Sequence, residues 1–431
     1  MNNKKQSGSL IAIITMFFLY AMISFVTNLG APIGVIWKNI FGNSNTVGTL
    51  GTLMNFAAYL FMGIPAGKML IKYGYKKTAL TALIVGIVGL AFQYLSSLVG
   101  AETGLFEYQG VTVTLNLIIY LLGAFICGFC VCMLNTVVNP MLNLLGGGGN
   151  KGNQLIQIGG TLNSLTGTLT PLLTGLLVGT VTKDTHMSDV SPLLFIGMAV
   201  FAISFVIISR VEIPEPTLGK EQPKYERSPL AFRHCLLGII AIFFYVGIEI
   251  GIPMQLNFYL TDLGFEGAAV VGGAYAAAYW FLMMVGRFCS SFISGKVSTR
   301  TQLTIVSAVA ITLLVIAIFM PESSKMTISL ISDNPVPTKS VLIAVCGLCT
   351  SIMWGGIFNL SVEGLGKYTE AASGLFMTMV VGGGIMPLIQ ESIAKSAGII
   401  NSYWLVIGML AYILFYALIG SRNVNKDIKV D

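Results

Sequence analysis

The chain has 431 residues, of which 55% are hydrophobic and 10% are charged, and its formal net charge is +6. Soluble globular domains carry about 25% charged residues. The composition therefore excludes an ordinary soluble protein and indicates a polytopic membrane protein.

Twelve apolar runs follow one another along the chain. A helix needs about 20 apolar residues to cross roughly 30 Å of hydrocarbon, and the backbone in lipid must satisfy its own hydrogen bonds. We therefore predict an all-α protein with twelve transmembrane helices. The first run is too long for the apolar region of a cleaved secretory signal and is followed by further spans. The predicted helices span residues 10–37, 46–70, 79–99, 112–145, 152–180, 191–210, 232–262, 268–294, 303–321, 339–365, 369–395 and 401–421.

The longest predicted cytoplasmic connection, RVEIPEPTLGKEQPKYERSPLAFR (210–233), is charged and proline-rich and divides the helices six and six. Two motifs in the halves are weakly similar: GKMLIKYGYKKT (67–78) and GKVSTRTQL (295–303). Related halves of six helices are typical of secondary transporters that bind substrate near the midplane between them. The predicted parts are an amino-terminal bundle (1–210), a linker (211–231) and a carboxy-terminal bundle (232–431).

The basic residues of the loops predict the orientation, because cytoplasmic loops carry an excess of Lys and Arg. With a cytoplasmic amino terminus, most of them fall on the cytoplasmic side. The opposite side has Lys38, Lys183, Lys325, Lys339 and Lys395. Both termini are therefore predicted to be cytoplasmic. The net charge of +6 is a topology signal and not a nucleic-acid footprint.

Nothing in the sequence indicates catalysis or a bound metal. Cys127/Cys130 and Cys346/Cys349 spell C-x-x-C, but each pair lies in an apolar run with no histidine nearby. Packing is therefore a better interpretation than a zinc or redox site. The chain also shows no set of nucleophile and base, so we do not expect an enzyme or a cofactor other than a coupling ion.

Ionisable residues within the predicted spans are few. No Asp or Glu lies in any span of the first half, whereas Glu249 lies well inside the seventh span, and Glu363 and Glu391 lie near the ends of theirs. Charges inside a membrane are costly and usually functional, so Glu249 is our candidate coupling residue. The alternative is a structural hydrogen bond within its helix. Arg287 lies near the inner end of the eighth span.

The interior is otherwise lined by neutral polar groups. In CMLNTVVNPMLNLL (132–145), Asn135, Asn139 and Asn143 are four residues apart and share a helical face. Amides both donate and accept hydrogen bonds, which suits a ligand rich in hydroxyl groups, and an aromatic face suits a sugar ring. For any single amide, the alternative is an interhelical hydrogen bond. The candidate substrate-binding residues are Asn28, Asn135, Asn139, Asn163, Gln255, Asn257, Trp280, Trp354 and Asn359.

Several motifs together resemble a known family. GKMLIKYGYKKT is similar to the loop signature of the major facilitator superfamily, with Ile71 where the family has aspartate. The motifs LNTVVNP (134–140), GGTLNSLTGTLTPLL (159–173), YVGIEIGIP (245–253), VGRF (285–288) and GLGKYTEAASGLFMTMVVGGGIMP (364–387) resemble the fucose/glucose/galactose:proton symporter family. The resemblance implies the major facilitator fold, sugar transport and alternating access. It also implies that Lys72, Lys76, Lys77 and Arg287 form a cytoplasmic gate; positive-inside topology is the alternative for the lysines.

The resemblance also shows which coupling residues are replaced. The fucose member of the family has acidic residues in the first and fourth helices, at the positions of Ala31 and Asn135, and a glutamine at the position of Gly160. Asn135 keeps the hydrogen-bonding capacity of a carboxylate but binds no proton near neutral pH. Three mechanisms stay open: an uncoupled facilitator, Na⁺ coupling through oxygen ligands, and proton coupling moved to Glu249.

The predicted function is cation-coupled uptake of a neutral sugar, a hexose or related monosaccharide, by a monomer in the lipid bilayer of a bacterial cytoplasmic (inner) membrane. The alternatives are a sugar facilitator, a carrier of another neutral solute such as a nucleoside or amino sugar, and a drug exporter. A non-transporting nutrient sensor on the same scaffold is also considered. No nucleic-acid partner is expected.

Overall fold

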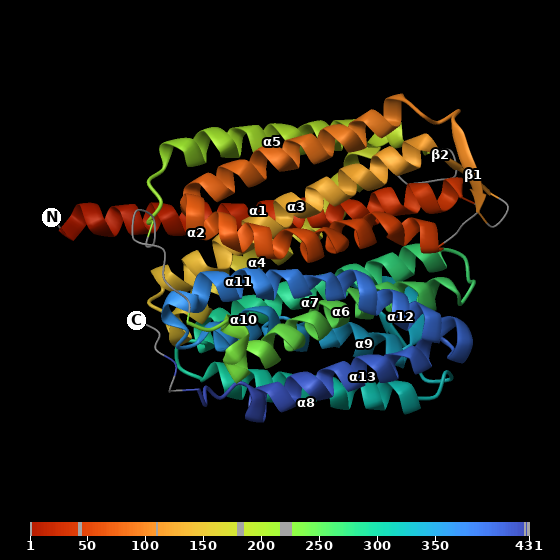
Figure 1. The fold of residues 1–431 in the computed structure, drawn as a ribbon. Coiled ribbons are helices and arrows are strands. Elements are labelled where there is room, and N and C mark those ends of the chain that lie inside the picture. The colour runs from red at the N-terminus through yellow and green to blue at the C-terminus, as the bar shows by residue number, and fades with distance from the viewer. Residues whose placement is uncertain are drawn as a thin grey trace. The chain divides into compact units, whose positions relative to one another are not determined.

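The computed structural model describes residues 2–41, 45–108, 111–178, 185–215, 226–425 and 428. These residues are mainly helical, with two short hairpins (Figure 1). The first helices are α1 (Asn2–Ile40), α2 (Asn45–Leu98), α3 (Leu115–Leu145), α4 (Gly149–Val178) and α5 (Ser191–Arg210). Those that follow are α6 (Arg233–Thr261), α7 (Ala268–Ile293), α8 (Thr299–Phe319), α9 (Thr338–Thr350), α10 (Met353–Val362), α11 (Thr369–Thr378), α12 (Gly382–Ala397) and α13 (Ile399–Phe415).

The helices confirm the predicted all-α membrane fold. Within the described residues, ten segments are long and apolar enough to span a membrane. One of them, Val47–Leu98, contains two predicted helices, because α2 is interrupted at Gly74, whose φ is 82° and ψ is 177°. The fifth predicted helix corresponds to α4, which has 30 residues but a more polar sequence. Each of the twelve predicted runs thus overlaps a described helix.

Two helix breaks and two hairpins were not predicted. The eleventh predicted span is interrupted by a 3₁₀ turn, Met379–Val381, which separates α11 from α12. The tenth predicted span is divided at Ser351–Ile352 into α9 and α10, and no proline marks the break. Strand β1 (Gly104–Tyr108) pairs antiparallel with β2 (Val111–Thr114). Strand β3 (Lys325–Ile328) pairs with β4 (Ser332–Pro337) in the same way. Both hairpins lie in connections that the sequence predicts to be external.

By packing, the chain divides into two compact units. Unit 1 contains Met1–Met141, Leu165–Pro223 and Ser373–Thr378; unit 2 contains Leu142–Ser164, Lys224–Ala372 and Met379–Asp431. Unit 2 therefore includes the end of α3 and the first half of α4, which belong by sequence to the amino-terminal half. The predicted domain boundaries at 210 and 232 stay a prediction.

Glycines allow close helix packing inside unit 2. A Cβ atom added at Gly382 of α12 would lie 1.9 Å from the backbone carbonyl oxygen of Phe243 in α6. A backbone atom cannot be moved aside as the end of a flexible side chain can, so only glycine fits at this crossing. By contrast, a Cβ at Gly408 of α13 would meet no atom within 4 Å. Close packing is therefore required at particular glycines and not at all of them.

Candidate functional site

The asparagine row of α3 forms a neutral cluster in unit 1. The Nδ2 of Asn135 donates to the hydroxyl of Tyr59 over 2.9 Å. The Nδ2 of Asn139 donates to the backbone oxygen of Asn135 over 2.8 Å, and the hydroxyl of Tyr20 donates to Oδ1 of Asn139. These four side chains are buried. The cluster joins α1, α2 and α3 through hydrogen-bonding groups that carry no charge.

The third member of the row has a different role. Asn143 lies in unit 2, where its Nδ2 donates to Oδ1 of Asn359 over 2.9 Å. Asn359 in turn donates to the hydroxyl of Thr299 over 3.4 Å. For Asn143, the structure thus shows an interhelical hydrogen bond, the alternative given above for any single amide. Asn359 is engaged in the same contact, and its substrate role stays a prediction.

A buried ion pair occupies the interior of unit 2. Arg287 of α7 and Glu249 of α6 approach to 3.0 Å between Nη2 and Oε1, and their side chains are 7% and 13% exposed. The same Oε1 accepts a hydrogen bond of 2.9 Å from the hydroxyl of Tyr245, one turn earlier on α6. The sequence singled out both charged residues but did not predict that they pair.

Arg287 satisfies all five of its N–H groups in this site. Its Nε donates to the carbonyl of Ser351 at 2.9 Å, at the α9–α10 break. Its Nη1 donates to the carbonyl of Gly160 at 3.0 Å and to the hydroxyl of Ser164 at 2.8 Å, both in α4. Its Nη2 donates to Glu249 and, at 3.5 Å, to Tyr245. A guanidinium has five donors, so one side chain connects α4, α6, α7 and α9.

A helix break and a glycine make this arrangement possible. The helix break at Ser351 leaves a carbonyl oxygen available to Arg287, and the next carbonyl, that of Ile352, accepts a hydrogen bond of 3.2 Å from Nε2 of Gln157. A Cβ at Gly160 would lie 3.2 Å from Cδ of Arg287. Glycine at position 160 therefore lets the arginine side chain pass close to the backbone of α4.

The other candidate substrate residues are dispersed. In α6, Nε2 of Gln255 donates to Glu391 over 2.8 Å, and Asn257 accepts from Thr261 over 3.3 Å. In α1, Asn28 donates to the backbone oxygen of Ser24 over 2.9 Å. The remaining three are partly buried: Asn163 in α4, Trp280 beside Tyr279 in α7, and Trp354 beside Tyr245 in α10. The structure leaves their predicted roles as predictions.

The predicted gate lysines lie in unit 1, where an acidic residue missed by the sequence analysis joins them. Lys72 and Lys77 are exposed. Lys76 donates from Nζ to the carbonyls of Ser209 and Val211, at 2.9 and 2.8 Å. The carboxylate of Glu215 accepts hydrogen bonds of 2.8 Å from the backbone N–H groups of Tyr75 and Lys76, directly after the turn at Gly74. Glu215 thus caps the second helix of α2.

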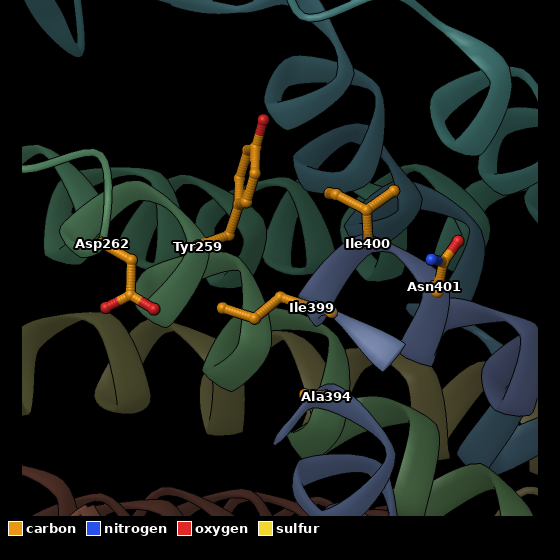
Figure 2. Close-up of a pocket in the computed structure, with 7 residues that line it drawn as sticks. Tyr259, Asp262, Ala394, Ile399, Ile400 and Asn401 are labelled. Carbon is orange, nitrogen blue, oxygen red and sulfur yellow. The ribbon is translucent and has the colours of Figure 1, made fainter. Parts of the chain in front are cut away.

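Figure 2 shows a pocket at one end of unit 2, with a volume of about 400 Å³. Tyr259 and Asp262 come from the end of α6, and Ile399 to Asn401 come from the start of α13. None of the predicted substrate residues lines this pocket. The predicted central cavity between the two halves stays a prediction.

A second charged contact lies beside this pocket. Glu322, outside the spans, accepts hydrogen bonds from Nζ of Lys339 at 2.7 Å and from the hydroxyl of Tyr259. Burial raises the pKa of Glu322, but the hydrogen bonds from Lys339 and Tyr259 and the charge of Lys339 lower it by more. The net pKa lies below the ordinary value of 4.5.

Comparison with known proteins identifies the family of this chain. A model of the Major Facilitator Superfamily matches residues 13–387. The chain belongs to this superfamily. It is 30% identical over 432 residues to a glucose/galactose transporter of Brucella abortus biovar 1 (strain 9-941), and the match covers 98% of this chain and 96% of the relative. The resemblance predicted from the motifs is thereby confirmed.

Two further relatives also match over almost their full length. A putative glucose/galactose transporter of Helicobacter pylori (strain ATCC 700392 / 26695) is 27% identical, covering 98% of this chain and 100% of the relative. The L-fucose-proton symporter of Escherichia coli (strain K12) is 20% identical, covering 96% and 93%.

Among solved structures, the E. coli fucose:proton symporter is similar with a TM-score of 0.76 and 19% identity, covering 96% of this chain and all of that one. A proton:xylose symporter reaches a TM-score of 0.67 at 10% identity, covering 95% of this chain and 94% of that one. At these identities the likeness shows the fold. It is the major facilitator fold predicted from the sequence.

Proposed function

We propose that this superfamily member is a secondary transporter of a neutral hexose, which it takes up by alternating access with a coupled cation. Relatives matched over nearly their whole length carry the names glucose/galactose transporter and L-fucose-proton symporter. The proposal includes a monomer in a bacterial cytoplasmic membrane, with both termini in the cytoplasm.

The observation that carries this proposal is the neutral cluster on α3. Asn135 and Asn139 are buried with the hydroxyls of Tyr59 and Tyr20, and helices α1 to α5 contain no Asp or Glu. A charged substrate would need an opposite charge in this part of the site, whereas amides and hydroxyls suit the hydroxyl groups of a sugar. We propose that Asn135 binds a sugar hydroxyl.

A coupled transporter is favoured over a facilitator because unit 2 keeps an ion pair within its helices. Charged side chains inside a membrane are costly, and they mark ion pathways and proton relays. The Arg287–Glu249 pair fits such a role, and a passive carrier of a neutral sugar does not need it. A drug exporter is disfavoured by the amide-rich cluster of α3.

Counterflow in proteoliposomes tests the proposed function. Vesicles loaded with unlabelled glucose, galactose or fucose should accumulate the labelled sugar transiently, without any ion gradient. Asn135→Ala should raise the KM about two- to tenfold, the effect of losing one hydrogen bond. Asn401→Ala, an exposed amide on α13, serves as the matched control and should leave the KM unchanged. If the wild type shows no counterflow with neutral monosaccharides, the proposed sugar transport is refuted. If Asn135→Ala has the same KM as the Asn401→Ala control, the proposed binding role of Asn135 is refuted.

A further inference from the structure

The Arg287 contacts connect an ionisable carboxylate to a helix of the other sequence half. The guanidinium binds Glu249 on α6 and, through the opposite nitrogen, the Gly160 carbonyl and the Ser164 hydroxyl on α4. Residues 142–164 belong to the amino-terminal half by sequence but pack in unit 2. A change at Glu249 can therefore reach α4 through a single side chain.

We propose, on the basis of the proposed transport function, that Glu249 binds the coupling proton and that Arg287 transmits its protonation state to α4. In the structure, the carboxylate and the guanidinium balance each other and the bridge to Gly160 and Ser164 is intact. A hydronium ion of the aqueous medium gives its proton to the carboxylate: one O–H bond of hydronium breaks, an O–H bond of the carboxylic acid forms, and water is released. The guanidinium then loses the negative charge of Glu249, its ion-pair partner, in a part of unit 2 where both side chains are largely buried.

An unbalanced buried charge is strongly unfavourable, and loss of one partner exposes the full cost. Protonation of Glu249 therefore destabilises the arrangement in which Arg287 contacts Gly160 and Ser164 of α4. By thermodynamic reciprocity, an arrangement in which the bridge is broken takes up the proton more readily. The proton gradient and the contact of α4 with α7 are thus coupled through Arg287, a positioning residue.

The surroundings of Glu249 favour a proton over a metal cation. The ionisable groups that act on it are Arg287 and Tyr279 of α7 and Tyr245 on its own helix. Among the described interactions, α9, α10, α12 and α13 contribute no further charged group to Glu249; Glu391 of α12 binds Gln255 and Lys395 instead. A Na⁺ ion at this carboxylate would lie beside a guanidinium and be repelled. A proton adds no cation next to the arginine, because it neutralises the carboxylate.

Glu249→Gln tests the proposal, because glutamine has the shape of the protonated carboxyl and cannot lose its proton. Proteoliposomes with wild-type protein should accumulate hexose when an inward proton gradient is imposed, and the external medium should become alkaline when sugar is added. Glu249→Gln should lose both responses, with counterflow still measurable. Glu391→Gln removes another carboxylate of the spans, one bound to Gln255 rather than to an arginine, and should keep proton-driven accumulation.

Each outcome decides a different claim. The assigned proton site is wrong if the wild type shows counterflow but no proton-driven accumulation, or if Na⁺ alone drives accumulation. Either result leaves the proposed sugar transport intact. Glu249→Gln that accumulates hexose like the wild type also overturns it. If Glu249→Gln loses counterflow as well, the double variant Glu249→Gln/Arg287→Gln decides. If the double variant recovers counterflow but not proton-driven accumulation, the proposal is supported. If the double variant does not recover counterflow, the proposal is overturned. Wild-type protein without counterflow refutes the proposed function itself.

Discussion

Replacing Arg287 by methionine should destabilise unit 2 strongly, because it leaves the Glu249 carboxylate buried without its partner. Both side chains are largely buried, at 7% and 13% exposed. Removing one partner of a buried pair costs about 3–5 kcal/mol, and we take the lower end because Glu249 keeps some exposure and its hydrogen bond from Tyr245. For domains of roughly 150–250 residues, 1 kcal/mol shifts the Tm by about 2–4 °C. The expected fall in Tm is therefore about 6–12 °C.

Thermal unfolding in detergent, followed by tryptophan fluorescence, measures this effect. Lys395→Met is the control, since Lys395 is 62% exposed and lies 3.8 Å from Glu391. Such an exposed pair contributes about 0.3–0.5 kcal/mol, so its Tm should change by about 2 °C or less. Adding Glu249→Gln to Arg287→Met should recover part of the loss, because the orphaned charge is removed. The deficit of Arg287→Met should also shrink as the pH is lowered, because protonation neutralises Glu249.

Two results would refute this reasoning. One is an Arg287→Met variant that unfolds at the same temperature as the Lys395→Met control. The other is a double variant whose loss of Tm equals the sum of the two single losses, because independent residues are additive and paired residues are not.

Three other regions give separate predictions. Because the pKa of Glu322 is lowered, its contacts with Lys339 stabilise the folded protein above the unfolded-state pKa and are lost as the pH falls through the folded-state pKa. Glu322→Gln should therefore lower the Tm at neutral pH, by the equivalent of about 1 kcal/mol, because the carboxylate is 59% exposed although Lys339 is buried, and should match the wild type in acid. Gly382→Ala should cost about 1–3 kcal/mol or prevent folding, whereas Gly408→Ala, which meets no atom within 4 Å, should not lower the Tm. Glu215→Ala removes two charged hydrogen bonds of 2.8 Å and should cost about 1.5–3 kcal/mol or more, detectable as faster proteolysis near the Gly74 turn; unchanged cleavage would contradict the cap.

The extent of the helices could be predicted because lipid imposes a simple rule on the sequence. Long apolar runs mark the spans, and even α4, with Gln157 and Asn163 inside it, overlaps its predicted run. The break at Ser351–Ile352 could not be predicted, because no proline or glycine marks it. Its effect depends on Arg287 and Gln157, which come from other helices.

The sequence allowed us to predict which residues belong to the candidate site, but not which of them contact one another. Arg287 and Glu249 are 38 positions apart, and Glu215 is 139 positions from Lys76. Such separations carry no periodic signal, since which faces of two helices meet is decided by packing. The loop motif has Ile71 where the resemblance leads one to expect an aspartate, but Glu215 supplies a carboxylate to the same turn from after α5.

The β3–β4 hairpin is a suitable site for inserting an epitope. Leu330 at its tip is 95% exposed, and the strands on both sides are paired. Loop tips of this kind tolerate inserted sequence, so an epitope placed there should leave the spans undisturbed. Binding of an impermeant antibody to intact cells would then report on which face of the membrane the hairpin lies, and with it the direction in which the whole chain is threaded.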